Sequence, residues 1–346
     1  MGISKWNDGI IRPIPVAPTG PYQDGAASGI WTLDQVAYWT KQGLWPIAGN
    51  SQRGLFGGGA ITGGTAINVI QYITISTTGN AIDFGDLTVS RYGISSCSSS
   101  TRGIFGGGYT GAVSNVIDYV TIASTGNALD FGDLTLGRIS LSSCSSSTRG
   151  VFGGGSSPQL GVRYNIIDYI TIASTGDATD FGDLLAVFNS LSACASSTRG
   201  IFSGGLDVSA NPTNVIQYIT IATTGNSTDF GDLLAGTSGL GACSNATRGI
   251  IAGGETSVAT LNVIQYITIA TTGDAIDFGD LTIARYDISN SGCASTTLAV
   301  FAGGNPSYKN VIDYVTIATL GNATDFGDLI SPTAYLAGCS NTHGGL

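Results

Sequence analysis

Residues 115–134 read Asn-Val-Ile-Asp-Tyr-Val-Thr-Ile-Ala-Ser-Thr-Gly-Asn-Ala-Leu-Asp-Phe-Gly-Asp-Leu, and six versions of this stretch occur along the chain. The closing string Asp-Phe-Gly-Asp-Leu has its Phe at positions 84, 131, 181, 230, 278 and 326. In each version the Phe lies 16 residues after the opening Asn. Self-similarity at a nearly fixed period is the signature of a repeat protein, in which each unit packs against its neighbours.

Two further runs complete each repeat. A Gly-rich run precedes the Asn, as in residues 102–108 (Arg-Gly-Ile-Phe-Gly-Gly-Gly), and a run of small residues with one Cys follows the Leu, as in residues 94–98 (Ile-Ser-Ser-Cys-Ser). Successive Cys residues are 46 to 50 positions apart. Each repeat therefore predicts four short strands separated by turns, named here A (Cys run), B (Gly-rich run), C (Asn-Val-Ile run) and D (Asp-Phe-Gly run).

Four strands in each of six repeats predict an all-β fold, a six-bladed β-propeller with four-stranded blades. Strand A carries only small residues, as expected beside a crowded central axis. A-like segments lie near both ends of the repeats, at 44–49 and 333–340. We expect the C-terminal segment to complete the first blade, so that pairing of the chain ends closes the ring. A parallel β-helix is the main alternative, but its coils are usually shorter than this period.

The repeat resembles the kelch family. Arg91-Tyr92-Gly93-Ile94, then the double glycine Gly106-Gly107, then Tyr119 match an Arg that opens the innermost strand, a double glycine that closes the second strand and a Tyr in the third. The chain departs from that pattern because Phe131 replaces the outer-strand Trp and lies 12 residues after Tyr119. The resemblance implies a kelch-like propeller over residues 48–346.

Composition excludes several classes. The 346 residues include 52 Gly but only one Glu, three Lys and one Met, so the residues that fill exposed helix positions are scarce. The net charge of -10 disfavours nucleic acid and anionic membranes as partners. An apolar run of the ~18 residues needed to span a membrane is missing, so we expect no membrane insertion.

The first 47 residues differ from the repeats and are predicted to form a separate arm. All four Trp lie there (Trp6, Trp31, Trp39 and Trp45), together with five of the nine Pro. Residues 12–22 predict an extended segment and residues 33–42 a short helix capped by Thr32. A helix of about ten residues is unstable alone, so it docks on the repeats or on a partner. The second reading makes the four Trp anchoring residues.

A short part of the arm resembles a segment of bacteriophage tail and virion proteins, especially those of marine and cyanobacterial phages. The resemblance rests on Ala27-Ser28-Gly29-Ile30-Trp31-Thr32-Leu33-Asp34-Gln35 and on Gly43-Leu44-Trp45-Pro46. It implies a tail-fibre or appendage protein of the virion, oligomeric in the particle, that is attached to other virion proteins through residues 1–47.

Catalytic chemistry finds little support. The only His, His343, aligns with the repeat Arg, so neither a Ser-His-Asp site nor a His-ligated metal site is expected. Asp-Phe-Gly resembles a kinase loop, but the other kinase motifs are missing. Asn80, Asp83 and Asp86 offer oxygen ligands for calcium without the spacing of a dedicated loop. Six Cys, one per repeat, are too far apart to bridge and are predicted to be free and buried. We predict no catalytic residues, metal or cofactor.

Comparison of the repeats predicts where binding occurs. The A–B and C–D connections hardly vary, whereas the B–C and D–A connections differ in length and chemistry, and the two sets belong to opposite faces of a four-stranded meander. Loops on a rigid scaffold commonly carry binding sites, although unselected drift would also vary them. The predicted contact residues on the varied face are Tyr109, Arg163, Tyr164, Asp207, Asn211, Tyr308 and Lys309.

These observations predict a non-enzymatic virion component whose varied face binds a host-surface glycan or protein, or another virion protein. One alternative is a propeller enzyme that cleaves polysaccharide, which would release sugar from host glycans. Another is a bacterial adhesive or scaffolding propeller, which the gene's neighbours would distinguish.

Overall fold

The computed structural model describes residues 5–6, 9–10, 34–35, 52–288 and 292–346. The chain divides into two compact units, Met1–Ser51 and Gln52–Leu346. In the first unit β1 (Lys5–Trp6) pairs with β2 (Gly9–Ile10), and Asp34 and Gln35 are helical and exposed. The remainder of the helix expected over 33–42, and the extended segment 12–22, lie outside the described residues.

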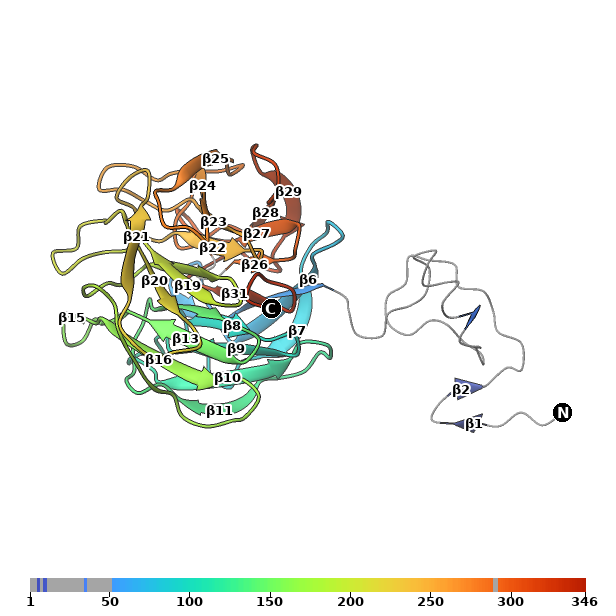
Figure 1. Cartoon of the computed structure of the whole chain (residues 1–346). Helices are drawn as coiled ribbons and strands as arrows, with labels where there is room; N and C mark the ends of the chain where they lie inside the picture. Colours follow the sequence, from blue (N-terminus) through green and yellow to red (C-terminus); the bar gives the residue numbers. More distant parts are fainter. Residues whose placement is uncertain (1–4, 7–8, 11–33, 36–51, 289–291) are drawn as a thin grey trace. The chain divides into compact units, whose positions relative to one another are not determined.

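The second unit is built from four-stranded antiparallel sheets, six in the described residues (Figure 1). From first to fourth strand, sheet 1 contains β31 (Ala337–Ser340), β3 (Arg53–Gly57), β6 (Val69–Thr74) and β7 (Ile82–Asp86). Sheet 2 contains β8 (Ser95–Ser98), β9 (Arg102–Gly106), β10 (Val116–Thr121) and β11 (Leu129–Asp133). Sheet 3 contains β12 (Ser142–Ser145), β13 (Arg149–Gly153), β16 (Ile166–Thr171) and β17 (Thr179–Asp183).

The remaining sheets repeat this order. Sheet 4 contains β18 (Ser192–Ala195), β19 (Arg199–Ser203), β20 (Val215–Thr220) and β21 (Thr228–Asp232). Sheet 5 contains β22 (Gly241–Ser244), β23 (Arg248–Ala252), β24 (Val263–Thr268) and β25 (Ile276–Asp280). Sheet 6 contains β26 (Cys293–Ala294), β27 (Leu298–Ala302), β28 (Val311–Thr316) and β29 (Thr324–Asp328). The first to fourth strands correspond to runs A to D of the sequence.

Short strands extend the loops of two sheets. β4 (Ala60–Ile61) lies between β30 (Thr333–Ala334) and β5 (Thr65–Ala66), and β14 (Ser156–Ser157) pairs with β15 (Val162–Arg163). These pairs were not predicted, because their residues lie in B–C and D–A connections that differ between repeats.

Sheet 1 takes its first strand from far along the chain, because β31 pairs antiparallel with β3 and sets Cys339 opposite Leu55. The first strands of neighbouring sheets also contact one another, in the order β31, β8, β12, β18, β22 and β26, and β26 contacts β31. Figure 1 shows β31 and the C-terminus near the middle of this arrangement. The fold is therefore all-β and propeller-like.

Apolar side chains fill the spaces between neighbouring sheets. One buried cluster combines Phe131 and Ile117 of sheet 2 with Phe152 and Ile170 of sheet 3. Another combines Phe326 of sheet 6 with Phe56 of sheet 1. Since each sheet buries both faces, the third strands read as nearly continuous apolar runs, which is the pattern seen in the sequence.

In sheets 1 to 5, the repeated Arg of the second strand connects the sheet to the next one. Arg102 lies over the ring of Tyr119, with its guanidinium carbon 4.8 Å from the ring centroid, and its Nη1 donates to the carbonyl of Ile172 in sheet 3. The same pair of interactions recurs at Arg53, Arg149, Arg199 and Arg248. The equivalent position in sheet 6 is Leu298.

The Asp-Phe-Gly-Asp strings are structural. The amide groups of Gly126 and Ala128 donate to the carbonyls of Phe84 and Asp86, so the C–D connection of sheet 2 covers the outer strand of sheet 1. Gly85 has a φ of +148°, and a Cβ there would lie 2.4 Å from the carbonyl oxygen of Gly126. Glycine is thus required where the two backbones meet. The contact recurs between sheets 6 and 1, where Gly79 donates to Phe326.

Candidate binding site

The B–C and D–A connections lie side by side, each D–A connection against the B–C connection of the next sheet. Isolated antiparallel bridges join Tyr92 to Tyr109, Ile139 to Ser156, Asn189 to Leu206, Ser238 to Glu255 and Tyr286 to Asn305. Ala334 of β30 pairs with Ala60 of β4 in the same way. These connections therefore form one continuous surface, called here the varied face.

Six residues, one from each D–A connection, form a cycle of backbone hydrogen bonds under this face. Gly93 donates to Tyr335, Tyr335 to Asp287, Asp287 to Gly239, Gly239 to Ser190, Ser190 to Ser140, and Ser140 back to Gly93. All six have φ values between 51° and 66°. This left-handed region suits Gly and is costly for bulky residues, so Asp287 and Tyr335 stand apart from the four small members.

Tyrosines gather where these two larger residues lie. The ring of Tyr92 is 5.5 Å from that of Tyr109 and 5.8 Å from that of Tyr335, both tilted by 54°. Burial raises the pKa of Tyr92, Tyr286 and Tyr335, and the nearness of Tyr308 raises the pKa of each of them further. All five tyrosines are partly buried. Connections of sheets 1, 2, 5 and 6 thus converge in one aromatic group, called here the tyrosine cluster.

Asp287 lies within the tyrosine cluster and, with Tyr335 and the four small members of the cycle, lines a small hollow. Its carboxyl accepts hydrogen bonds from the Tyr335 hydroxyl and from Asn305 Nδ2, the latter at 3.3 Å. Burial of the carboxyl raises the pKa of Asp287 to about 7, and the charge of Glu255 adds to the rise. The hollow therefore holds an acid that changes charge near neutral pH.

The predicted contact residues separate into two groups. Tyr109 and Tyr308 belong to the tyrosine cluster, and Lys309, next to Tyr308 in the chain, is partly buried and donates its amide to Gly304. The other four belong to connections of sheets 3 and 4, and no contact joins them to the cluster in the described residues: Arg163, Tyr164, Asp207 and Asn211.

The second group organises its own loops. Arg163 Nε donates to Asn189 Oδ1 at 2.8 Å and its Nη1 reaches the carbonyl of Val208, so it ties two connections together. Asp207 Oδ1 accepts the amides of Ser209 and Asn211 in a turn, and these bonds lower the pKa of Asp207. Tyr164 is partly buried.

Four members of the site were missed by the sequence analysis: Tyr92, Tyr286, Asp287 and Tyr335. All four lie in D–A connections, whereas the predicted contact residues lie in B–C connections. A signal was present, because a small residue precedes an aliphatic one in Gly93-Ile94, Ser140-Leu141, Ser190-Leu191 and Gly239-Leu240. Asp287-Ile288 and Tyr335-Leu336 break that pattern at the same position.

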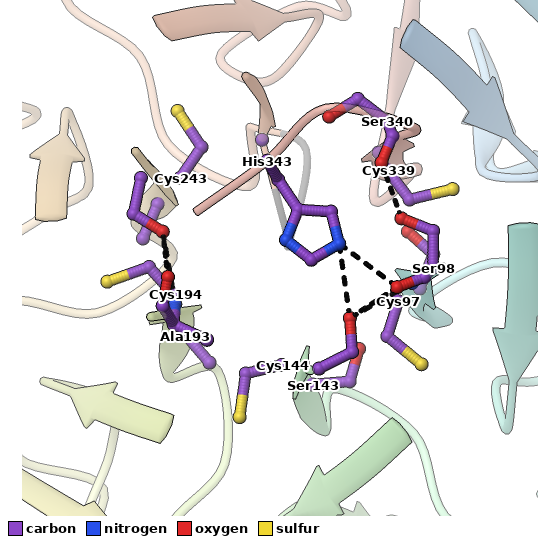
Figure 2. Close-up of a pocket in the computed structure, with 17 residues that line it drawn as sticks. Cys97, Ser98, Ser143, Cys144, Ala193, Cys194, Cys243, Cys339, Ser340 and His343 are labelled. Atoms are coloured by element: carbon purple, nitrogen blue, oxygen red, sulfur yellow. Dashed lines mark hydrogen bonds between the residues drawn. The ribbon is translucent and has the colours of Figure 1, made fainter. Parts of the chain in front are cut away.

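A second hollow lies among the first strands, and His343 occupies it (Figure 2). The His343 Nε2 lies 3.0 Å from the carbonyl oxygen of Ser98 and 3.3 Å from Ser145 Oγ, while Nδ1 accepts the amide of Gly345. Burial lowers the pKa of His343. In the sequence His343 aligns with the repeat Arg, but its imidazole lies among the first strands, whereas the repeat Arg lies over a tyrosine ring. The two positions are therefore not equivalent in the fold.

Five of the six Cys line this hollow (Cys97, Cys144, Cys194, Cys243 and Cys339), and all six are free and buried, as predicted. Figure 2 shows the labelled sulfur atoms pointing away from the imidazole. Cys97 Sγ points toward Gly150 of sheet 3, where a Cβ would lie only 2.6 Å from the sulfur. Burial raises the pKa of every one of these thiols, so they act as small apolar side chains.

The calcium alternative gains no geometric support in the part of the chain that the structure describes. Asn80 Oδ1 accepts the amide of Asp328, while Asp83 is exposed and Asp86 partly buried. In the described ranges, groups of three or more His, Cys, Asp or Glu side chains suited to a metal are not found.

Of the predicted anchoring residues, Trp6 lies in β1, and Trp31, Trp39 and Trp45 lie outside the described residues. Within those residues, none of the helices has the length and apolar character needed to cross a membrane.

The geometry defines an all-β, propeller-like repeat protein with a candidate binding site on its varied face. No protein-family model matches the chain, and no curated protein matches it.

Proposed function

We propose that the second unit is a closed, six-bladed, kelch-like β-propeller that binds a partner and performs no catalysis. Closure is supported by the pairing of β31 with β3 and by the cycle of hydrogen bonds from Gly93 through Tyr335. A kelch-like reading is supported by the double glycine and Tyr of each repeat and by the Arg before the first strand in three of them (Arg91, Arg138 and Arg285), although Phe replaces the outer Trp.

The tyrosine cluster is the observation that carries the binding function. Five tyrosines from separate connections meet on the varied face and leave part of each ring accessible. Partly exposed aromatic side chains commonly provide the anchors of protein interfaces. The uniform face instead uses its repeated residues to join neighbouring sheets.

We further propose that the chain is a bacteriophage virion component, a tail fibre or appendage, attached through residues 1–47 to other virion proteins. The support is the resemblance of residues 27–46 to phage virion segments, together with the change in composition at the end of the arm. In this proposal the varied face remains free for a host-surface or virion partner.

The three lysines allow a direct test. Lys5 and Lys41 belong to the arm, and Lys309 lies in a connection of the varied face. Lysine-reactive cross-linking of virus particles, purified from cultures that carry the gene, should join Lys5 or Lys41 to other particle proteins. Lys309 should acquire cross-links when particles are mixed with host envelope fractions.

The control is a particle carrying Lys309→Arg, which should lose only the second set of cross-links. Absence of the chain from purified particles would overturn the virion assignment. Release of reducing sugar from host glycans by the purified chain would overturn the non-enzymatic assignment.

A further inference from the structure

We propose that the hollow beside Asp287 binds the ammonium or guanidinium group of a Lys or Arg side chain on a partner protein. This inference rests on the proposed function, since it assigns a chemistry to the ligand of the varied face. Asp287 provides the countercharge, and Tyr335 of the tyrosine cluster lines the hollow beside it.

The first argument is charge. Among the described residues, the hydrogen-bond donors to the Asp287 carboxyl are both neutral, the Tyr335 hydroxyl and Asn305 Nδ2. Arg285, two residues earlier in the chain, is committed to Asp313, with Nη2 2.9 Å from Oδ2. Glu255 adds a second negative group near Asp287. A cation entering the hollow would therefore meet acidic groups that have no positive partner among the described contacts.

The second argument is the aromatic environment. Tyr335 lines the hollow with Asp287, and its ring continues a row formed with Tyr92 and Tyr109. Tyr286 also lies close to Asp287. A cation within about 6 Å of a ring centroid is attracted by the ring's negative face. Rings around a carboxylate thus favour an organic cation over an anion or an apolar group.

The third argument is backbone strain. Asp287 and Tyr335 have φ values of 51° and 59°, and Tyr308 has a φ of 45°. Gly or Ser provides the same hydrogen bond at four equivalent positions of the cycle. Because the fold does not need these larger side chains there, the conformational cost points to a role for the side chains themselves.

The hollow also predicts a dependence on pH. The ionisable groups that act on Asp287 are Glu255, Tyr286 and Tyr335, and the raised pKa values of Tyr286 and Tyr335 keep both tyrosines neutral below pH 8. Burial raises the pKa of Asp287 to about 7, so the carboxyl becomes fully charged only above neutrality. Affinity for a cation should then rise between about pH 6 and pH 8.

Calorimetric titration of the full chain tests the proposal. The probes are N-acetyl-arginine methylamide and N-acetyl-lysine methylamide, and the neutral comparison is N-acetyl-citrulline methylamide. Both cationic probes should bind, and the citrulline probe should bind at least roughly tenfold more weakly, since it lacks the charge that pairs with Asp287. Asp287→Asn should lower the affinity of the arginine probe by a similar factor and remove its rise with pH.

Two further variants separate binding from folding. Asp130→Asn changes an exposed acid of the outer strand β11, away from the varied face, and should leave probe affinity unchanged. Tyr335→Gly introduces the residue found at the equivalent positions 93 and 239, and it should weaken binding several-fold while thermal unfolding shows that the sheets remain intact. Equal binding of the citrulline and arginine probes, or unchanged affinity in Asp287→Asn, would overturn the proposal.

Failure here is distinguishable from failure of the proposed function. If Lys309 cross-links to an envelope component and neither cationic probe binds, the varied face is an interface and the cation site is wrong. Binding of maltohexaose in place of the cationic probes would likewise replace the cation with a neutral saccharide.

Discussion

Arg91 Nη2 lies 2.7 Å from Asp118 Oδ2, and both side chains are fully buried between sheets 1 and 2. The same ion pair joins Arg138 to Asp168. Three repeats have Phe188, Thr237 or Thr333 at the position of Arg91. In these repeats the residue at the position of Asp118 in the next sheet is a Gln, respectively Gln217, Gln265 and Gln71. The last of these partnerships runs from sheet 6 back to sheet 1, where Gln71 Oε1 accepts the amide of Ile330. The repeats thus carry two interchangeable sets of buried contacts.

Changing one member of the ion pair should be costly. Asp118→Gln leaves the buried Arg91 without its countercharge and should lower the free energy of unfolding by about 3–5 kcal/mol. The double variant Arg91→Thr/Asp118→Gln copies the natural combination of Thr237 and Gln265, and it should recover most of that loss. Urea unfolding of the full chain at neutral pH provides the measurement.

The reverse exchange is the matched control for this prediction. Gln217→Asp buries a carboxylate opposite Phe188 and should destabilise the chain, and adding Phe188→Arg should restore part of the stability. If Asp118→Gln cost less than about 1 kcal/mol, the pair would be behaving like an exposed one, and the argument from burial would be wrong.

Removal of the C-terminal strand should affect all sheets together. Deletion of residues 331–346 removes β31 and leaves β3 without its first partner, so the sheets should unfold in one cooperative transition at a much lower temperature. Differential scanning calorimetry would reveal this change. Deletion of residues 343–346 alone keeps β31 and should have a smaller effect. A loss of one strand's signal with little change in melting temperature would refute cooperative closure.

His343 should make stability depend on pH. Burial lowers the pKa of His343 in the folded chain below the unfolded value of about 6.5, so the unfolded state binds the proton more readily. The stability that neutral His343 contributes is therefore fully present above about pH 7 and is lost as the pH falls below 6.5. Protonation would also remove Nδ1 as acceptor for the Gly345 amide. Thermal melts of the chain and of His343→Gln between pH 5 and 8 should differ in slope.

Asp287 should have the opposite effect on the pH dependence of stability, so its contribution must be measured separately from that of His343. Its pKa is raised to about 7 in the folded chain, so stability is lost as the pH rises from the unfolded value of about 4 through 7. Asp287→Asn should flatten that loss and should leave the acid-side loss from His343 in place. Identical pH profiles for the chain and both variants would contradict both assignments.

A methyl group at Gly150 should be tolerated only when the facing thiol is removed. Its Cβ would lie 2.6 Å from Cys97 Sγ, so Gly150→Ala should cost about 1–3 kcal/mol through overpacking. Cys97→Ala in the same chain should relieve the contact. Gly137→Ala is the control, because the nearest atom to a Cβ at Gly137 would be the Val113 carbonyl oxygen at 3.2 Å, farther than the sulfur is from a Cβ at Gly150. Urea unfolding of Gly150→Ala, the double variant and Gly137→Ala would compare the three.

Much of the fold was predictable from sequence because each strand of a repeat has its own recognisable run of residues. The Asp-Phe-Gly-Asp strings, the Gly-rich runs and the Cys runs correspond to the fourth, second and first strands of the sheets. The free and buried state of the Cys was also predicted correctly. Three positions change together between repeats: Thr88, Arg91 and Asp118 correspond to Leu185, Phe188 and Gln217. This joint change is visible in the sequence and indicates that the three positions are in contact across neighbouring sheets.

The candidate site was less predictable because it depends on residues that only the fold brings together. Tyr92 and Tyr335 are separated by most of the chain, yet their rings are 5.8 Å apart. Their meeting requires sheet 1 to follow sheet 6 in space. The position of His343 was also not predictable from the repeat. It aligns with the repeat Arg in sequence, but in the structure it lies among the first strands of several sheets.

Pairing of β31 with β3 also affects how the chain is made. Arg53 donates its amide to Asn341 Oδ1 across 288 positions, so sheet 1 is incomplete until β31 has been synthesised. Sheets 2 to 5 each consist of strands close together in sequence and can form during synthesis, at about 5–20 residues per second. A chain that stops before β31 exposes the unpaired edge of β3, a surface on which aggregation or degradation can act. The fold thereby distinguishes chains that include β31 from those that stop short of it.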